Sequence, residues 1–182
     1  MEATEYQRIY EAVHERQSDY GSHHGSWATE SIKEMLPTGG SFLDMGCGRM
    51  QMCADVKRVR PDAVVIGFDV VVPLVLPPDV QFIHSPMWDL SALEGQADMI
   101  GCFDALEHLY PEDVNKTLEA FHTALVPGGW FFTSISFQSS VILGPEGQNL
   151  HPTVHPFAWW VNRLDEWFDV LPCAGHLKGR KK

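Results

Sequence analysis

Residues 41–50 read SFLDMGCGRM, which places an apolar run, an acid and two glycines within ten positions. Gly46 and Gly48 let the backbone turn tightly and approach a ligand closely, because glycine has no side chain to obstruct either. Asp44 stands just before this turn. A carboxylate there would repel a phosphate group, whereas it would attract a cation. The stretch therefore predicts a strand that ends in a glycine turn suited to a positively charged ligand.

Segments of strand type and of helix type alternate along the rest of the chain. Strands are expected at 41–45, 63–70, 79–85, 97–103 and 130–137, and helices at 3–15, 26–36, 50–59 and 111–125. Such alternation predicts an α/β fold, a Rossmann-like doubly wound sheet in three αβα layers, mostly parallel, with six or seven strands. Sheets of this kind bind ligands at the carboxyl ends of their strands, beside the first strand. The glycine turn lies there.

The composition is that of a globular protein. The chain has 182 residues, of which 45% are hydrophobic, and this length suits a single domain with a full core. Thirteen Lys and Arg against 24 Asp and Glu give a formal net charge of -11, which disfavours nucleic acid as a partner. The one basic cluster, HLKGRKK at 176–182, is interpreted as a solubilising tail.

Cysteine usage and the N-terminal residues predict a cytoplasmic protein. The four cysteines have neither zinc-ribbon nor C-x-x-C spacing, so reduced thiols are expected. The first residues show no signal-peptide pattern. No apolar run approaches the roughly 20 residues that span a bilayer, so no membrane partner is expected.

Two ligand classes compete for the glycine turn. A dinucleotide fold uses G-x-G-x-x-G, but Gln51 stands at the third glycine position, and Asp44 would face a pyrophosphate. The alternative is a ligand with an ammonium group. The sequence DMGCG at 44–48 resembles the first motif of the class I S-adenosylmethionine-dependent methyltransferases. Further likenesses are Asp69, about 20 residues past the turn, the LEHL segment at 106–109 and the LVPGG turn at 125–129.

The resemblance implies S-adenosylmethionine as cofactor and S-adenosylhomocysteine as product. It implies that Asp44 anchors the methionyl ammonium and that Asp69 accepts the ribose hydroxyls. Where many relatives hold the adenine amino group with an acid, this chain has Pro86, so that contact is lost or moves to Asp89. The candidate cofactor-binding residues are Asp44, Gly46, Cys47, Gly48, Asp69, Val70, Met87, Trp88 and Phe103. A core role for Trp88 is the alternative.

The resemblance also divides the chain into three parts within one domain. Residues 1–37 form a helical cap, 38–136 the cofactor-binding core, and 137–182 the acceptor loop, a helix and the last strand. The seventh strand of the family is expected to be short, supplied by the tail, or missing, because little chain follows residue 175. A missing strand would leave an open sheet edge at which a homodimer could form.

Methyl transfer from a sulfonium chiefly needs positioning, so few catalytic residues are required and no general base is assigned. Asp104, Glu107 and His108 resemble the Glu-x-x-Glu-His metal motif of ubiquinone-pathway and small-RNA methyltransferases, with His155 as a further ligand. The alternative, which we favour, is that Glu107 and His108 orient their loop without metal. No metal site is therefore predicted.

The acceptor region is expected around two loops. His151 and His155 are each followed by proline, which favours a loop over one helix face and makes zinc binding a poor fit. Tyr20 and His23 are candidates for a lid near the cofactor's carboxylate. The predicted function is methyl transfer to O or N of a small-molecule acceptor. The alternatives are a metal-assisted RNA 2′-O-methyltransferase-like enzyme and a non-catalytic cofactor-binding module.

Overall fold

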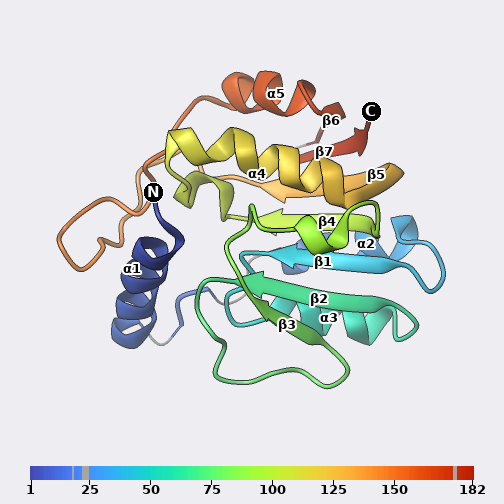
Figure 1. Cartoon of the computed structure of the whole chain (residues 1–182), viewed down its shortest axis with the longest axis horizontal. Coiled ribbons are helices and arrows are strands. Elements are labelled where there is room, and N and C mark those ends of the chain that lie inside the picture. Colours follow the sequence, from blue (N-terminus) through green and yellow to red (C-terminus); the bar gives the residue numbers. More distant parts are fainter. Residues whose placement is uncertain (18, 22–24, 174–175) are drawn as a thin grey trace.

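The computed structural model describes residues 1–17, 19–21, 25–173 and 176–182. Seven strands of the described chain form one sheet in the order β3-β2-β1-β4-β5-β7-β6 (Figure 1). They are β1 (Ser41–Met45), β2 (Val64–Asp69), β3 (Gln81–His84), β4 (Ala97–Phe103), β5 (Leu125–Ser134), β6 (Phe168–Cys173) and β7 (His176–Lys181). Strands β1 to β5 pair in parallel, and β7 is antiparallel to β5 and β6. The predicted mostly parallel α/β sheet is confirmed.

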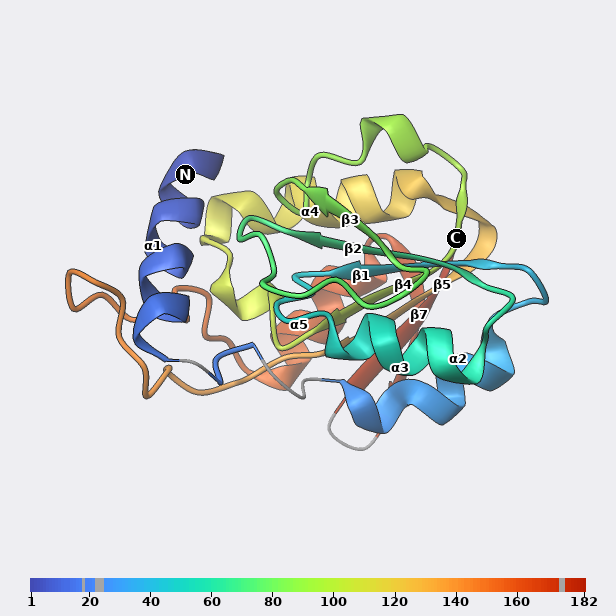
Figure 2. The same ribbon diagram turned by 90° about the horizontal axis from the view of Figure 1, so that it is seen from below.

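Helices cover both faces of the sheet. They are α1 (Ala3–Arg16), α2 (Thr29–Met35), α3 (Gln51–Val59), α4 (Pro111–Ala124) and α5 (Phe157–Asp165). Helices α2 and α3 lie on one face and α4 on the other, whereas α1 stands across the end toward which β1 and β2 point (Figures 1 and 2). This end carries the predicted ligand site.

Neighbouring residues of a strand enter opposite halves of the core. Leu43 and Phe131 belong to the cluster that includes residues of α4 and α5, whereas Phe42 and Phe132 belong to the cluster that includes residues of α2 and α3. Successive side chains of a strand point to opposite faces, so a strand covered on both faces needs apolar residues in succession. This explains the continuous apolar runs of the central strands.

Of the three alternatives for the seventh strand, the structure bears out the one in which the tail supplies it, and the strand is not missing. Residues 176–181 form β7, which pairs with β5 on one side and β6 on the other. The basic residues of this segment are therefore part of the sheet and not a solubilising tail. Leu177 is buried, the Nε of Arg180 donates to the Gly128 carbonyl (3.0 Å), and the Nζ of Lys181 donates to the Leu125 carbonyl (2.8 Å). Along the strand, buried Leu177 and Gly179 alternate with the less buried His176, Lys178 and Arg180, as expected for successive residues that face opposite sides of a sheet.

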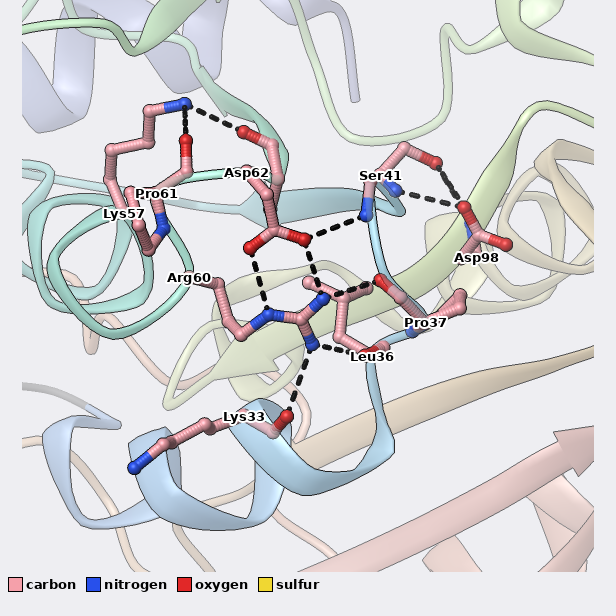
Figure 3. Close-up of polar contacts among 11 residues, drawn as sticks. Lys33, Leu36, Pro37, Ser41, Lys57, Arg60, Pro61, Asp62 and Asp98 are labelled. Atoms are coloured by element: carbon pink, nitrogen blue, oxygen red, sulfur yellow. Dashed lines mark hydrogen bonds and ion pairs between the residues drawn. The ribbon is translucent and has the colours of Figure 1, made fainter.

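Polar contacts fix the strand ends opposite the predicted site (Figure 3). Asp98 Oδ2 accepts hydrogen bonds from the backbone N–H of Ser41 (2.8 Å) and from its hydroxyl (3.0 Å), which ties the start of β1 to β4. The guanidinium of Arg60 donates to the backbone carbonyls of Lys33, Leu36 and Pro37. These carbonyls end helix α2, so Arg60 joins α2 to the end of α3.

Candidate active site

A cavity of about 440 Å³ lies at the carboxyl ends of β1, β2 and β4. Residues of α1 and the segment 19–21 line its outer side. All nine predicted cofactor-binding residues line this cavity: Asp44, Gly46, Cys47, Gly48, Asp69, Val70, Met87, Trp88 and Phe103. Their contact with a cofactor stays a prediction, but the parallel sheet brings them to one place as expected.

Asp44 is a buried carboxylate at the end of β1, with 3% of its surface exposed. The thiol of Cys53, in the first turn of α3, donates to Asp44 Oδ2 (3.2 Å). Burial raises the pKa of Asp44 to about 7, although the Cys53 hydrogen bond lowers it; Asp69 raises it further. A cation beside Asp44 would stabilise its ionised form. This carboxylate therefore fits the ammonium group of the expected cofactor.

The glycine turn is crossed by the N-terminal segment. Gly46 and Gly48 have φ values of 72° and 49°, which disfavour other residues. A Cβ atom on Gly48 would lie 2.8 Å from the Gly21 carbonyl oxygen, which also accepts the N–H of Arg49 (3.3 Å). Tyr20, in this segment, lines the cavity, and its role as a lid stays a prediction. His23 lies outside the described residues.

Asp69 ends β2 and supports the same turn. Its Oδ2 accepts the N–H of Gly48 (2.8 Å), and its Oδ1 accepts the N–H of Val71 (2.9 Å). Burial raises its pKa, against the lowering effect of these backbone hydrogen bonds. Each carboxylate oxygen has a second lone pair, so Asp69 can still accept hydroxyl groups from the cavity.

Trp88 lies between the cavity and the core, and its contact with a cofactor stays a prediction. It lines the cavity, and its ring also packs edge-on against Tyr6, with ring centroids 5.5 Å apart. Asp89 is exposed and is not among the residues found on the cavity wall. The backbone around Met87 and Trp88 is therefore better placed than Asp89 to contact an adenine.

Two imidazoles and a carboxylate meet at another part of the cavity. Glu107, His108 and His151 offer ligand atoms that lie within 4.8 Å of one another. Glu107 is fully buried, and its Oε1 accepts the N–H of Ser136 (2.8 Å). The rings of His108 and His151 are 4.6 Å apart. The group combines an acid and two bases, so it can hold a cation or accept a proton.

Backbone carbonyls set the tautomers of both imidazoles. His108 Nδ1 lies 2.7 Å from the Leu150 carbonyl oxygen, and His151 Nδ1 lies 2.6 Å from that of Gln138. A carbonyl oxygen only accepts, so each Nδ1 carries the proton and each neutral ring has its lone pair on Nε2. Tyr10 Oη lies 2.9 Å from His108 Nδ1 and helps to orient that ring.

His151, and not the expected His155, approaches Glu107 and His108. The loop before α5 is anchored at Thr153, whose hydroxyl donates to the Leu109 carbonyl (2.5 Å) and whose N–H donates to the Glu107 carbonyl (3.3 Å). This anchor turns the chain so that His155 stacks on Trp159, with ring centroids 4.0 Å apart. Asp104 lines the cavity but is not in the group of close ligand atoms.

The role of Tyr10 in the cavity was not predicted. Only a helix at 3–15 was expected in this part of the chain, with no role in a ligand site for its side chains. Tyr6, on the same face, donates to Asp113 Oδ2 (2.8 Å) and accepts the N–H of Tyr110 (2.7 Å). These contacts with the start of α4 hold α1 against the site, and a local pattern carries no signal for them.

The sequence matches a family model described as a methyltransferase domain over residues 14–178. The chain belongs to the class I S-adenosylmethionine-dependent methyltransferases. Its sheet order and the antiparallel β7 agree with the fold predicted from the resemblance. S-adenosylmethionine is therefore the cofactor of this methyltransferase, and it supplies an activated methyl group when bound.

Solved structures share the methyltransferase fold at low sequence identity. The Burkholderia thailandensis 1,6-didemethyltoxoflavin-N1-methyltransferase, solved with S-adenosylhomocysteine, is 17% identical with a TM-score of 0.66, over 99% of this chain and 87% of that one. Haemonchus contortus phosphoethanolamine N-methyltransferase 2 is 15% identical with a TM-score of 0.66. The match covers 83% of this chain and 38% of that one. An O-methyltransferase family protein from Burkholderia thailandensis is 15% identical with a TM-score of 0.59. The match covers 86% of this chain and 56% of that one.

The search of curated proteins found no match to the methyltransferase. In the part of the chain that the structure describes, no helix has both the length and the apolar character needed to cross a bilayer.

Proposed function

We propose that this methyltransferase transfers a methyl group to oxygen or nitrogen of a small-molecule acceptor. The observation that carries the proposal is the single continuous cavity of about 440 Å³, in which Asp44 and Asp69 share a wall with His108 and His151. Its size falls in the range of small-molecule sites. The solved N- and O-methyltransferases with the same fold support this class of reaction.

In this proposal each half of the cavity has one task. Asp44 binds the ammonium of the cofactor, and Asp69 binds its ribose, while the glycine turn lets the backbone approach. On the acceptor side, an Nε2 atom of the imidazole pair takes the proton that an attacking hydroxyl or amine loses. Tyr10 and Tyr20 exclude water from the space between the two halves.

The test measures S-adenosylhomocysteine release from S-adenosylmethionine with mixtures of small amines, phenols and alcohols, and separately with total RNA. We expect turnover with members of the small-molecule set and none with RNA. The His108→Ala variant should lose about a hundredfold in kcat while its affinity for S-adenosylhomocysteine changes less than about twofold. Turnover with RNA alone would contradict the proposal.

A second candidate is metal-assisted O-methylation, because the close ligand atoms of Glu107, His108 and His151 suit a divalent ion. Dialysis against EDTA followed by metal analysis and an activity assay separates the two candidates. A stoichiometric ion whose removal abolishes turnover would favour this candidate, whereas turnover that survives the chelator would favour the first.

A further inference from the structure

Asp113 is a buried carboxylate that lies outside the cavity. It stands in the first turn of helix α4, with 2% of its surface exposed, and its side chain is not part of the cavity wall. A buried ionised group is costly unless its oxygens are paired. Neither half of the proposed site uses this carboxylate, so its partners indicate what it does.

The two oxygens of Asp113 hold two different side chains. Oδ2 accepts the hydroxyl of Tyr6 (2.8 Å), and Oδ1 pairs with the Nζ of Lys116 (2.6 Å). Burial raises the pKa of Asp113, but the hydrogen bonds from Lys116 and Tyr6 lower it, and the resulting pKa lies below the ordinary value. The carboxylate is therefore ionised at neutral pH and fixes the position of both groups.

Both of these partners contact the indole of Trp88. The Nζ of Lys116 lies over the ring, 3.8 Å from its centroid. The ring of Tyr6 packs edge-on against the same indole, with centroids 5.5 Å apart and an angle of 63° between the planes. A cation over an indole face and an edge-on pair of rings are both favourable, and both depend on orientation. Asp113 therefore holds two groups that each restrain the indole.

Trp88 stands on a turn, where such restraint matters. It lies between β3 and the next short helix, in a turn that the N–H of Asp89 closes by donating to the Pro86 carbonyl (3.1 Å). A side chain on a turn lacks the neighbours that orient a side chain within a strand or a helix. The indole lines the cavity, beside the backbone at which the adenine is expected. Its position therefore sets the space that is left for the adenine.

We propose that Asp113 is a positioning residue for the cofactor. Through Tyr6 and Lys116 it holds the indole of Trp88 on the cavity wall, at the place where the adenine binds. This inference rests on the proposed function, in which the cofactor lies in this cavity with its ammonium at Asp44. It adds a carboxylate outside the wall that joins α1 and α4 to the turn after β3.

The test is a double-mutant cycle on S-adenosylhomocysteine affinity, measured by calorimetry at a temperature where circular dichroism shows each variant to be folded. Asp113→Asn keeps the size of the side chain and an oxygen for the Tyr6 hydroxyl, but it no longer attracts Lys116. We expect it to weaken binding about three- to tenfold. In a Trp88→Leu background the same change should weaken binding less than about 1.5-fold, because the indole on which it acts is gone.

Two results of the cycle would overturn the inference. A purely structural role of Asp113 would give the same loss of affinity in both backgrounds. An unchanged affinity of Trp88→Leu itself would show that the indole does not contribute to cofactor binding. A second ligand locates the effect: 5′-methylthioadenosine has the adenine but no ammonium group. Asp113→Asn should weaken both ligands by a similar factor, whereas Asp44→Asn should weaken only S-adenosylhomocysteine. A loss in Asp113→Asn confined to S-adenosylhomocysteine would also overturn the inference.

Matched controls are available in the same helix. Glu112→Gln removes a charge from the neighbouring position, which is 63% exposed. Both carboxylates lie near the Met1 amino group, at 3.7 Å for Glu112 and 3.2 Å for Asp113, so this control also reports on that contact. Its affinity for S-adenosylhomocysteine should change less than about 1.5-fold. A loss equal to that of Asp113→Asn would contradict a role through Trp88.

Variants of Lys116 keep the test valid if Asp113→Asn does not fold, because the Lys116 side chain is 42% exposed. Lys116→Met removes the cation over the indole but keeps an apolar stem, and it should weaken S-adenosylhomocysteine binding about threefold. Lys116→Arg keeps a cation that can pair with Asp113 and lie over the ring, so it should lose less. An affinity of Lys116→Met equal to that of the unmodified protein would overturn the inference.

Failure of this inference is distinguishable from failure of the proposed function. Absence of S-adenosylhomocysteine binding by the unmodified protein, or an Asp44→Asn variant that binds it normally, would contradict the proposed function. Binding of S-adenosylhomocysteine that depends on Asp44 but not on Asp113 or Trp88 would overturn only the positioning role of Asp113.

Discussion

At the scale of single residues, Asp44 connects cofactor binding to pH. Its carboxylate has a pKa of about 7 in the free protein. In the proposed function, the cofactor's ammonium binds the ionised form of this carboxylate. We expect the affinity for S-adenosylhomocysteine to fall as the pH is lowered from about 7.5 to about 5.5, by up to about tenfold per pH unit. Calorimetry across this range measures it. Asp44→Asn should bind about 1.5–3 kcal/mol more weakly at pH 8 and show a flat profile.

The same residue also sets the pH dependence of stability. A carboxyl group whose pKa is raised by folding destabilises the folded state increasingly as the pH rises from its unfolded value of 3.8 to about 7. Removal of the charge in Asp44→Asn should therefore raise the free energy of unfolding of the cofactor-free protein more at pH 8 than at pH 5, by about 2 kcal/mol. Urea unfolding at the two pH values checks this. A larger gain at pH 5 would contradict the assignment.

Gly48 determines how closely the N-terminal segment crosses the turn. Gly48→Ala would place a methyl group 2.8 Å from the Gly21 carbonyl at a φ of 49°. We expect about a tenfold loss of S-adenosylhomocysteine affinity, because the turn or residues 19–21 must move. The control is Gly39→Ala, where φ is 68° and no atom lies within 4 Å of the new carbon. Gly39→Ala introduces similar backbone strain far from the cavity, so the affinity of this variant for S-adenosylhomocysteine should stay unchanged.

At the scale of elements, Arg60 holds helix α2 to α3. Arg60→Met removes the donors to the Lys33, Leu36 and Pro37 carbonyls, and we expect the free energy of unfolding to fall by about 1–2 kcal/mol. Arg58→Met is the matched control: Arg58 pairs only with Asp55 among the described residues and is 69% exposed, so its loss should cost less than about 0.5 kcal/mol. Urea unfolding of both variants decides the point. An equal loss of unfolding free energy in the two variants would contradict a structural role for Arg60.

At the scale of the whole molecule, the protein has a net charge of -11 and a cavity lined by carboxylates. It should therefore attract a ligand with a net positive charge more strongly than a neutral one. S-adenosylmethionine carries a net positive charge, whereas S-adenosylhomocysteine is a neutral zwitterion. Salt screens such long-range attraction. We expect binding of S-adenosylmethionine to weaken about threefold between 20 and 300 mM NaCl, and binding of S-adenosylhomocysteine to change less than about 1.5-fold. Calorimetry at both concentrations with both ligands measures the difference, and equal slopes would contradict this account.

Local pattern was sufficient to predict most of the fold and the residues that gather around the glycine turn. The order of strands and helices, the glycine turn, Asp44 and Asp69 were predicted because each depends on a short stretch of chain. The apolar runs of β1, β2 and β4 require burial on both faces, and parallel strands place their carboxyl ends together. The nine predicted residues consequently reach one cavity.

Contacts between distant segments decided the remainder. Residues 176–181 form β7 because β5 and β6 offer unpaired edges on both sides, which a basic composition cannot reveal. His151 reaches His108 in place of His155 because Thr153 is anchored to residues 107–109. Tyr10 faces the cavity because Tyr6 binds the start of α4. Each outcome depends on hydrogen bonds between residues about 40 to 100 positions apart, and the period of a single helix or strand carries no information about such partners.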